Sequence, residues 1–193
     1  MLTDAQIYDS LIQTNALRKG HFQLTSGRHS DTYVQCARVL EDPTLTLELA
    51  KEAVARLPKD IDIDVVAAPA VGGILIGFAV AQALGKRFIF SERQNGEMVF
   101  RRSFELAPGT KVLVVEDVVT TGGSVAEVIK LVEEAGAQTV GVVSLIDRGG
   151  DKKFTADFWP LLTLEVASWD RQDCRLCKDG VDIYSPGSRR LTK

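Results

Sequence analysis

Apolar positions along this chain follow two patterns, and their alternation predicts a layered fold. Short, almost wholly apolar runs are typical of buried strands, which we expect at residues 64–68, 87–90, 111–115, 140–146 and 161–166. The longer segments between them are expected to be helices, at residues 3–17, 43–57, 72–84 and 122–135. Strands that alternate with helices of this length predict an α/β fold, with a mainly parallel sheet and helices on both faces.

Polar residues mark the ends of several of these elements. Thr3 and Gln6 have the spacing of a capping box, and Asp42-Pro43 reads as an N-cap followed by proline at the first helical position. Asn95-Gly96 precedes the β-like residues 98–101, and this dipeptide is a strong signal for a hairpin. These signals predict two helix starts and one tight turn from local sequence alone.

The two ends of the chain are less regular. Residues 20–30 form a polar, turn-rich stretch, and a short strand is expected at residues 32–36. The tail after Asp170 reads as irregular. The sequence shows no internal repeat, low-complexity tract or clear linker, so its 193 residues predict a single domain.

Composition places the chain among ordinary soluble globular proteins, with 45% hydrophobic and 25% charged residues. A net charge of −3 and a sequence pI of about 5.5 argue against non-specific binding to nucleic acid. The apolar runs are too short to span a membrane, and the first ten residues do not resemble a signal peptide. Three cysteines do not suggest a secreted disulfide framework, so we expect a cytoplasmic protein without membrane or nucleic-acid partners.

The segment with the most chemical information is VLVVEDVVTTGGS at residues 112–124. Its apolar strand leads into two adjacent carboxylates, Glu116 and Asp117, at the edge where open α/β sheets bind ligands. The turn that follows offers backbone N–H groups and hydroxyls for a phosphate, from Thr120, Thr121, Gly122, Gly123 and Ser124. Because no lysine follows the glycines and GxGxxG is absent, it is neither a P-loop nor a dinucleotide fingerprint. Acceptors for sugar hydroxyls beside a phosphate cradle indicate a ribose 5-phosphate site.

This segment resembles the phosphoribosyl diphosphate (PRPP) signature of the type I phosphoribosyltransferases. The resemblance implies that fold, catalytic roles for Asp117 and Glu116 on the ribose, and Mg²⁺ carried in mainly by PRPP. It also implies a pyrophosphate-binding turn after the preceding strand, where this chain has APAVGG with Ala70, Val71, Gly72 and Gly73. Glycines there would let the backbone approach an anion closely, although an ordinary tight turn is the alternative interpretation.

Residues 20–35, GHFQLTSGRHSDTYVQ, resemble the base site and its cover in the orotate phosphoribosyltransferases. The positions that match are Phe22, Ser26, Gly27, Arg28, Ser30 and Tyr33. The resemblance implies that Tyr33, Thr25, Ser26 and Arg28 bind orotate. It also implies that about 1–40 and about 167–193 form a small hood over a PRPP-binding core at about 41–166. The alternative is a surface loop with one basic residue.

The motif LIDRG at residues 145–149 places Arg148 directly after a buried strand. A guanidinium can bind a carboxylate through two parallel hydrogen bonds, and orotate is a pyrimidine that bears a carboxylate. In the orotate family an arginine at this strand end contacts the base, so Arg148 is the candidate for substrate selection. The alternative is an exposed ion pair of Arg148 with Asp147 or Asp151.

The expected hairpin carries three arginines, Arg93, Arg101 and Arg102. In the orotate family such a loop reaches into the neighbouring subunit's site and supplies cations to the leaving pyrophosphate, which implies a homodimer. Better-known members carry several lysines and a histidine in this loop, a lysine near the position of Gly72 and another near Thr25, and this chain lacks them. It therefore resembles a separate bacterial branch, with Arg93 and then Arg102 as candidate catalytic cations.

Cys174 and Cys177 form a CxxC, which is half of a structural zinc site. The other soft ligands, Cys36, His21 and His29, are distant in sequence, and we expect both histidines at the surface because they flank a polar turn. No second half is evident, so no protein-bound metal is assigned and the two cysteines remain candidate zinc ligands. The alternative is a tail with two thiols near the cover of the base site, since a thioredoxin-like setting is absent.

The resemblance covers residues 11–148 and rests on four ordered motifs. It implies an enzyme that converts orotate and PRPP to orotidine 5′-monophosphate and pyrophosphate, the phosphoribosyl step of pyrimidine nucleotide synthesis. One alternative is a purine or uracil salvage phosphoribosyltransferase, which the TSGR segment and Arg148 disfavour. The other is a non-catalytic PRPP-sensing regulator that binds nucleic acid, which the paired acids, the arginine hairpin and the acidic pI disfavour.

Overall fold

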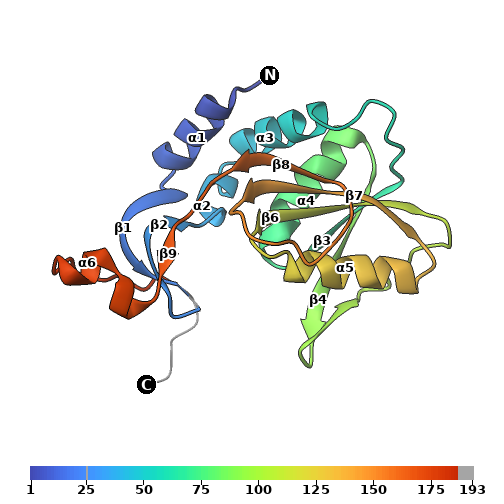
Figure 1. Cartoon of the computed structure of the whole chain (residues 1–193). Helices are drawn as coiled ribbons and strands as arrows, with labels where there is room; N and C mark the ends of the chain where they lie inside the picture. The colour runs from blue at the N-terminus through green and yellow to red at the C-terminus, as the bar shows by residue number, and fades with distance from the viewer. Residues whose placement is uncertain (25, 187–193) are drawn as a thin grey trace.

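The computed structural model describes residues 1–24 and 26–186, and it has the expected α/β architecture (Figure 1). Within these residues a six-stranded sheet has the order β5-β4-β3-β6-β7-β8, and only β5 runs antiparallel to its neighbour. Its strands are β3 (Val65–Pro69), β4 (Arg87–Gln94), β5 (Glu97–Phe100), β6 (Lys111–Val119), β7 (Gln138–Asp147) and β8 (Phe158–Thr163). The mainly parallel sheet confirms the fold class predicted from the alternating pattern.

Helices cover both faces of this sheet because alternate residues of its strands point to opposite sides. Val66 and Leu113 belong to the core under α3 and α4, whereas Val112 and Val114 belong to the core under α5. Figure 1 shows α3 above the sheet, α4 behind its strands and α5 below it. The helices are α1 (Asp4–Gln13), α2 (Ala37–Leu40), α3 (Pro43–Ala55), α4 (Gly72–Leu84) and α5 (Gly123–Glu134). Burial on both faces explains why the central strands read as continuous apolar runs.

The helix starts follow the predicted caps, but the first helix is shorter than expected. The hydroxyl of Thr3 accepts from the N–H of Gln6, and Asp42 caps the first turn of α3. The expected extension of the first helix to residue 17 is wrong, because Asn15 adopts a left-handed conformation (φ 57°) that ends it. None of the described helices is both long enough and apolar enough to cross a membrane.

A second, smaller sheet was only partly foreseen. It has the order β1-β2-β9 and is antiparallel, with β1 (Leu17–Gln23), β2 (His29–Val34) and β9 (Ser168–Trp169). Strand β1 occupies residues that we assigned to a helix end and to a turn-rich stretch. Its backbone is satisfied by β2 on one side and, near Phe22, by a bridge to Tyr184. The tail also contains a short 3₁₀ turn (Arg171–Asp173) and the helix α6 (Arg175–Lys178), where irregular chain was expected.

The expectation that both histidines lie at the surface is wrong. His21 is 4% exposed and His29 is 3% exposed. The pairing of β1 with β2 places the two rings 5.0 Å apart, and both cysteines of the tail lie within 4.8 Å of their nitrogens. The two histidines lie in a polar stretch of the sequence, but they are buried because residues of the distant tail cover them.

Several strands differ in extent from the apolar runs that predicted them. Strand β6 continues past residue 115 to Val119 because its polar end still pairs with β7, with Glu116 opposite Ser144. Strand β8 begins and ends three residues earlier than expected, and β2 is likewise displaced toward the N-terminus. The predicted hairpin is confirmed: Gln94 pairs with Glu97 across Asn95-Gly96.

Candidate active site

Two carboxylates lie near the carboxyl end of β6, inside the strand rather than beyond it. Glu116 is 8% exposed, and Asp117, the next residue, is half-buried. The backbone N–H of Asp117 donates to Oε1 of Glu116 over 3.0 Å. The strand ends two residues later, at Val119, so both side chains are fixed by a regular backbone.

The turn between β3 and α4 lies directly against these acids. A Cβ atom on Gly72 would lie 2.6 Å from Oδ1 of Asp117, and one on Gly73 would lie 3.1 Å from Oε1 of Glu116. Two positions without side chains are therefore needed for this close approach. The predicted pyrophosphate turn, residues 70–73, and the predicted ribose acids meet at the N-terminus of α4 although they are distant in sequence.

The buried position of the first acid changes its protonation. Burial, and then repulsion by Asp117, raises the pKa of Glu116 to about 9. Glu116 therefore holds a proton at neutral pH in the ligand-free protein. It can donate a hydrogen bond as well as accept one, which suits a group that faces sugar hydroxyls.

The turn that joins β6 to α5 forms a cradle for an anion. Gly122 has a left-handed backbone (φ 70°), and the ring of Phe154 occupies the space that its Cβ would need. Helix α5 begins at Gly123, so the first N–H groups of the helix have no intrahelical partner. A hollow of about 180 Å³ is lined by residues 118–125 and Glu116, and it includes all five residues predicted to bind the 5-phosphate.

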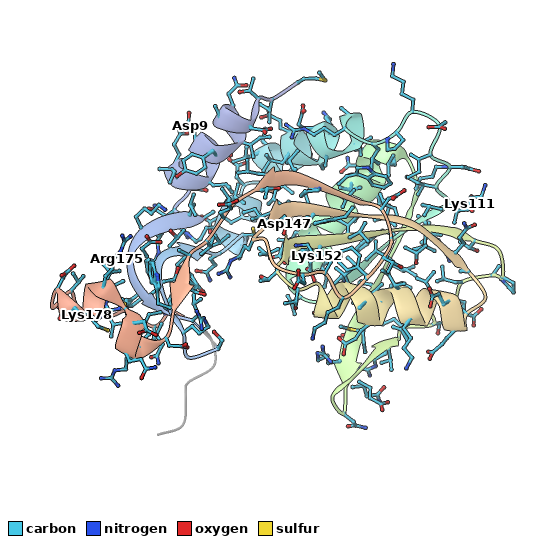
Figure 2. All side chains as sticks on the ribbon, viewed as in Figure 1. Asp9, Lys111, Asp147, Lys152, Arg175 and Lys178 are labelled. Carbon is cyan, nitrogen blue, oxygen red and sulfur yellow. The ribbon has the colours of Figure 1, made fainter. Side chains whose placement is uncertain are left out.

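Lys152 makes contacts that hold this turn in place. This role was not predicted from the sequence. Its ammonium donates to Oδ1 of Asp147 over 2.7 Å and to the carbonyl of Thr120 over 3.1 Å. It also donates to the carbonyls of Gly149 and Gly150. Figure 2 labels Asp147 and Lys152 side by side at the end of β7. The sequence offered no signal for this role, because one lysine in a charged loop reads as solvated.

Arg148 lies at the end of β7 without the ion pair that we considered as its alternative role. Asp147 pairs with Lys152 instead. Within residues 1–24 and 26–186 no carboxylate pairs with Arg148, and its buried Nε has no hydrogen-bond partner. Burial lowers the pKa of Arg148, although Tyr33 and Cys36 oppose this effect. A half-buried guanidinium of this kind is suited to an anionic ligand.

Cys36 connects Arg148 to the acids. Its Sγ lies 3.8 Å from the backbone oxygen of Asp117. Burial raises the pKa of this thiol well above its usual range, with further contributions from Asp117 and Glu116, whereas Arg148 lowers it. Tyr33, Arg148, Cys36 and the two acids therefore share one neighbourhood between the small sheet and the large one.

This arrangement agrees with comparisons to known proteins. A family model described as "Phosphoribosyl transferase domain" matches residues 40–173. An orotate phosphoribosyltransferase of Chlorobium phaeobacteroides (strain BS1) is 50% identical over 187 residues, 96% of each chain. One of Thermotoga maritima is 50% identical over 186 residues, 96% of this chain and 99% of its own. The chain belongs to the orotate phosphoribosyltransferase family.

A solved structure extends the likeness to the fold. The orotate phosphoribosyltransferase of Aeropyrum pernix superposes with a TM-score of 0.69 at 25% sequence identity. The match covers 82% of this chain and 94% of that one. The family predicted from the sequence motifs is therefore confirmed, while the roles of individual residues stay predictions.

An aromatic group lines the small sheet on the side of Tyr33. The rings of Phe22 and Tyr33 are 5.5 Å apart, and Tyr184 from the tail lies 6.4 Å from Phe22. The guanidinium of Arg18 lies over all three rings at 5.2 to 5.7 Å. Sequence reasoning missed Arg18, since we placed it just beyond a helix. Residues 17–23 show no alternation of buried and exposed positions, so the local sequence offered no signal for this role.

The other residues predicted for the base site have different surroundings. The guanidinium of Arg28 donates to the hydroxyl and carbonyl of Ser168 and pairs with Asp170 at 2.9 Å. Ser26 is exposed in the turn between β1 and β2. Thr25 lies outside the described residues. In this ligand-free chain Arg28 thus connects β2 to β9.

The two candidate cations of the hairpin are paired within this chain. Arg93 donates to Oε1 of Glu127 on α5 over 3.1 Å. Arg102 makes two hydrogen bonds of 3.0 Å to the carboxylate of Glu92. In Figure 1 the hairpin of β4 and β5 projects beyond the layer of α5, away from the small sheet. Within this chain both arginines thus pair with carboxylates other than Asp117.

Proposed function

We propose that this protein transfers the phosphoribosyl group of PRPP to orotate, which yields orotidine 5′-monophosphate and pyrophosphate in pyrimidine synthesis. The relatives named as orotate phosphoribosyltransferases support it, because they match nearly the whole chain at about half identity. The single structural observation that carries the choice of base is Arg148. Its half-buried guanidinium has no anionic partner among the described residues, and orotate would supply the missing carboxylate.

The reaction needs positioning and charge stabilisation rather than a covalent nucleophile. The bond from C1′ to the pyrophosphate oxygen breaks with its electron pair, which leaves positive charge on the ribose. N1 of orotate then bonds to C1′ and loses its proton, which the departing pyrophosphate takes up. Asp117 and Glu116 would hold the ribose hydroxyls and face that charge. Fixing both reactants in line accounts for a large part of such a rate enhancement.

The 5-phosphate and the pyrophosphate of PRPP would occupy two helix N-termini. Residues 120–124 would anchor the 5-phosphate through backbone N–H groups and hydroxyls at the start of α5. Residues 70–73 would receive the pyrophosphate at the start of α4. Both sites combine unpaired N–H groups with the positive end of a helix dipole. The ribose would then lie between them, against Asp117.

We also propose that Mg²⁺ enters with PRPP. The donor set fits this ion, which prefers phosphate and carboxylate oxygens and keeps several waters. Asp117, whose carboxylate lies against the glycine turn, would be the protein group nearest to it. When bound, the ion would neutralise charge on the pyrophosphate as it leaves.

We further propose a homodimer in which each hairpin serves the neighbouring site. Support comes from the hairpin of β4 and β5, which projects beyond the layer of α5 in Figure 1. Helix α4 also exposes apolar side chains, with Leu75 52% and Phe78 59% exposed. We propose the cytoplasm as the place of action, since the described cysteines are all free thiols, as is usual in a reducing compartment.

The function is tested by measuring pyrophosphate release from PRPP and Mg²⁺ with six bases offered separately: orotate, uracil, adenine, guanine, hypoxanthine and xanthine. We expect turnover with orotate alone. Turnover with a purine or with uracil would keep the PRPP site and overturn the role of Arg148. No turnover with any base would favour a non-catalytic regulator.

A further inference from the structure

Four side chains with soft ligand atoms meet on the small sheet, far from the acids of β6. Their ring nitrogens and sulfurs all lie within 4.8 Å of one another. We call them the His/Cys cluster: His21, His29, Cys174 and Cys177. The histidines come from β1 and β2, and the cysteines flank the start of α6, so the cluster joins the beginning of the chain to its end.

The spacing within the His/Cys cluster matches a tetrahedral metal site. Nε2 of His21 lies 3.0 Å from Nδ1 of His29 and 3.4 Å from Sγ of Cys174. Sγ of Cys177 lies 3.7 Å and 3.2 Å from the same two nitrogens. Zinc bond lengths in tetrahedral sites give ligand separations of about 3.3 Å for two nitrogens and about 3.6 Å for nitrogen and sulfur.

One histidine already has the outer contact that metal-binding histidines usually make. Nδ1 of His21 lies 2.8 Å from the carbonyl oxygen of Val181, which can only accept a hydrogen bond. The ring must therefore carry its proton on Nδ1, so the lone pair of Nε2 faces the centre of the cluster. Metal ligands are commonly oriented by a backbone carbonyl in this way.

The tail that carries the cysteines has almost no core of its own. Of the residues from 171 to 186, only Cys174 is buried. Figure 2 labels Arg175 on α6, whose exposed ion pair with Asp31 at 3.2 Å is one of the other contacts between the tail and the sheet. Such pairs contribute about 0–1 kcal/mol each. A segment that buries so little apolar surface needs another cross-link to stay ordered.

We propose that the His/Cys cluster binds one Zn²⁺, which fixes the tail onto β1 and β2. Two thiolates and two imidazoles in a closed, tetrahedral arrangement are the ligand set of structural zinc sites. Binding displaces the two thiol protons to solvent and requires no oxidant or reductant. All four positions are filled by protein, so the role is structural and the ion takes no part in phosphoribosyl transfer.

An ion can reach the His/Cys cluster from solvent, and the cluster is connected to the aromatic group of the small sheet. Cys177 is partly exposed and lines an open hollow with both histidines and Val181, so an ion can reach the cluster from solvent. On the other side of the cluster, Tyr184 exchanges backbone hydrogen bonds with His21 and Gln23. Zinc would therefore hold Tyr184 beside Phe22 in the aromatic group of the small sheet.

Metal content is the first test. Full-length protein, purified without chelator and dialysed, is analysed by inductively coupled plasma mass spectrometry, and we expect about one zinc per chain. Cys174→Ser and His29→Ala should each lower zinc content at least about tenfold. Cys36→Ser is the matched control, since it removes a buried cysteine outside the cluster and should keep the zinc. Cobalt substitution should give the absorption of a tetrahedral site with thiolate ligands.

A second measurement on the wild-type chain covers the case in which the variants fail to fold. Hydrogen exchange is compared with and without a chelator, and we expect residues 21–23 and 171–186 to exchange faster after zinc removal while β6 and β7 stay protected. Two results would overturn the proposal. One is wild-type protein that stays free of zinc after incubation with zinc chloride, and the other is a Cys174–Cys177 disulfide in the purified protein.

Discussion

At the scale of single residues, the two arginines proposed for the base site differ in what surrounds them. Arg28 donates to Ser168 and pairs with Asp170, whereas the Nε of Arg148 has no partner within the described residues. A buried polar group without a partner costs free energy, which an anionic ligand can offset. We therefore expect Arg148 to bind the orotate carboxylate and Arg28 to hold the cover.

Substitution of these arginines separates the two roles. Arg148→Gln should lower kcat/KM for orotate about 100-fold, because a buried charge-assisted pair is lost. The KM for PRPP should change little. Arg28→Gln should act mainly on the stability of the small sheet, since its partners are residues of β9 and the tail. Steady-state kinetics of both variants check this, and equal losses of orotate efficiency would contradict the assignment.

The protonated Glu116 predicts an unusual dependence of stability on pH. Its pKa in the folded protein is about 9, above the ordinary value of 4.5, so unfolding releases a proton between these limits. The free energy of unfolding therefore falls as pH rises through this window, by up to about 1.4 kcal/mol per pH unit. Glu116→Gln cannot titrate and keeps the acceptor for the N–H of Asp117. The variant should gain in Tm over the wild type as pH rises from 5 to 8, by about 2–4 °C for each kcal/mol.

Thermal unfolding of both proteins across this pH range provides the measurement. Glu133→Gln is the control, because Glu133 is exposed on α5 and its replacement should give no pH-dependent difference. If the difference between Glu116→Gln and the wild type were the same at every pH, Glu116 would be ionised in the folded protein.

The contact between the glycine turn and Asp117 predicts a coupled loss of activity. Gly72→Ala places a methyl group where Oδ1 of Asp117 lies, so the carboxylate has to move. Displacement of a catalytic group by about 1 Å can cost about 100-fold in rate. Asp117→Asn alone should also remove most turnover while the protein still folds. In a double-mutant cycle Gly72→Ala should add little to Asp117→Asn, and additive losses would show that the two residues act independently.

At the scale of elements, a loop of the candidate site depends on contacts with a neighbouring segment of the chain. The phosphate turn after β6 owes its shape to the segment after β7, through Phe154 against Gly122 and Lys152 against the carbonyl of Thr120. The side chains of Lys152 and Asp147 are 19% and 13% exposed, so their ion pair is largely shielded from solvent. We therefore expect Lys152 to act on PRPP binding only through the position of this turn.

Loss of the Lys152 contacts should weaken PRPP binding more than it lowers kcat. Lys152→Met leaves Asp147 and the carbonyl of Thr120 without their cation, and we expect KM for PRPP to rise about tenfold, about 1.4 kcal/mol. The kcat should change by less than that. Lys153→Met, a neighbouring substitution of an exposed lysine, is the matched control and should leave both constants unchanged. A fall in kcat with unchanged KM would contradict the positioning role.

The elements that could be predicted from the sequence are those that local signals specify. The caps at Thr3 and Asp42 and the hairpin at Asn95-Gly96 depend on near neighbours, and they appear where expected. The apolar runs of the large sheet also form strands, although the ends of several strands differ from the prediction. Strand β1 could not be predicted from its own polar residues, because its extended conformation depends on pairing with β2 and with the tail.

The residues of the candidate site also fall into two groups, those that a local motif reveals and those that only the fold brings together. Motifs that fill one turn, such as residues 120–124, were visible in the sequence. Of the His/Cys cluster only the CxxC pair was visible. The histidines were not linked to it, because His21 and Cys174 are 153 positions apart and no local pattern joins them. Lys152 and Arg18 were missed for the same reason: each is ordinary in its own segment and becomes informative only through what it touches in the fold.

At the scale of the whole molecule, the position of the hairpin predicts that activity needs two chains. Asp117→Asn and the double variant Arg93→Ala/Arg102→Ala should each be inactive alone. After the two are unfolded, mixed in equal amounts and refolded, half of the dimers would be hybrids with one intact site, so about a quarter of wild-type activity should return. An assay of pyrophosphate release checks this, and no recovery in verified hybrid dimers would place the hairpin in its own chain's site.

The small sheet also has a consequence for how the protein is made. The small sheet pairs β2 with β9, as His29 with Trp169, near opposite ends of the chain, whereas the large sheet pairs segments that lie closer together in sequence. During synthesis the PRPP-binding half can therefore fold while the tail is still inside the ribosome. Strands β1 and β2 can pair with each other before then, but β9 and Tyr184 join them last. A chain truncated before Ser168 would therefore leave Phe22 and Tyr33 without the cover that the tail provides.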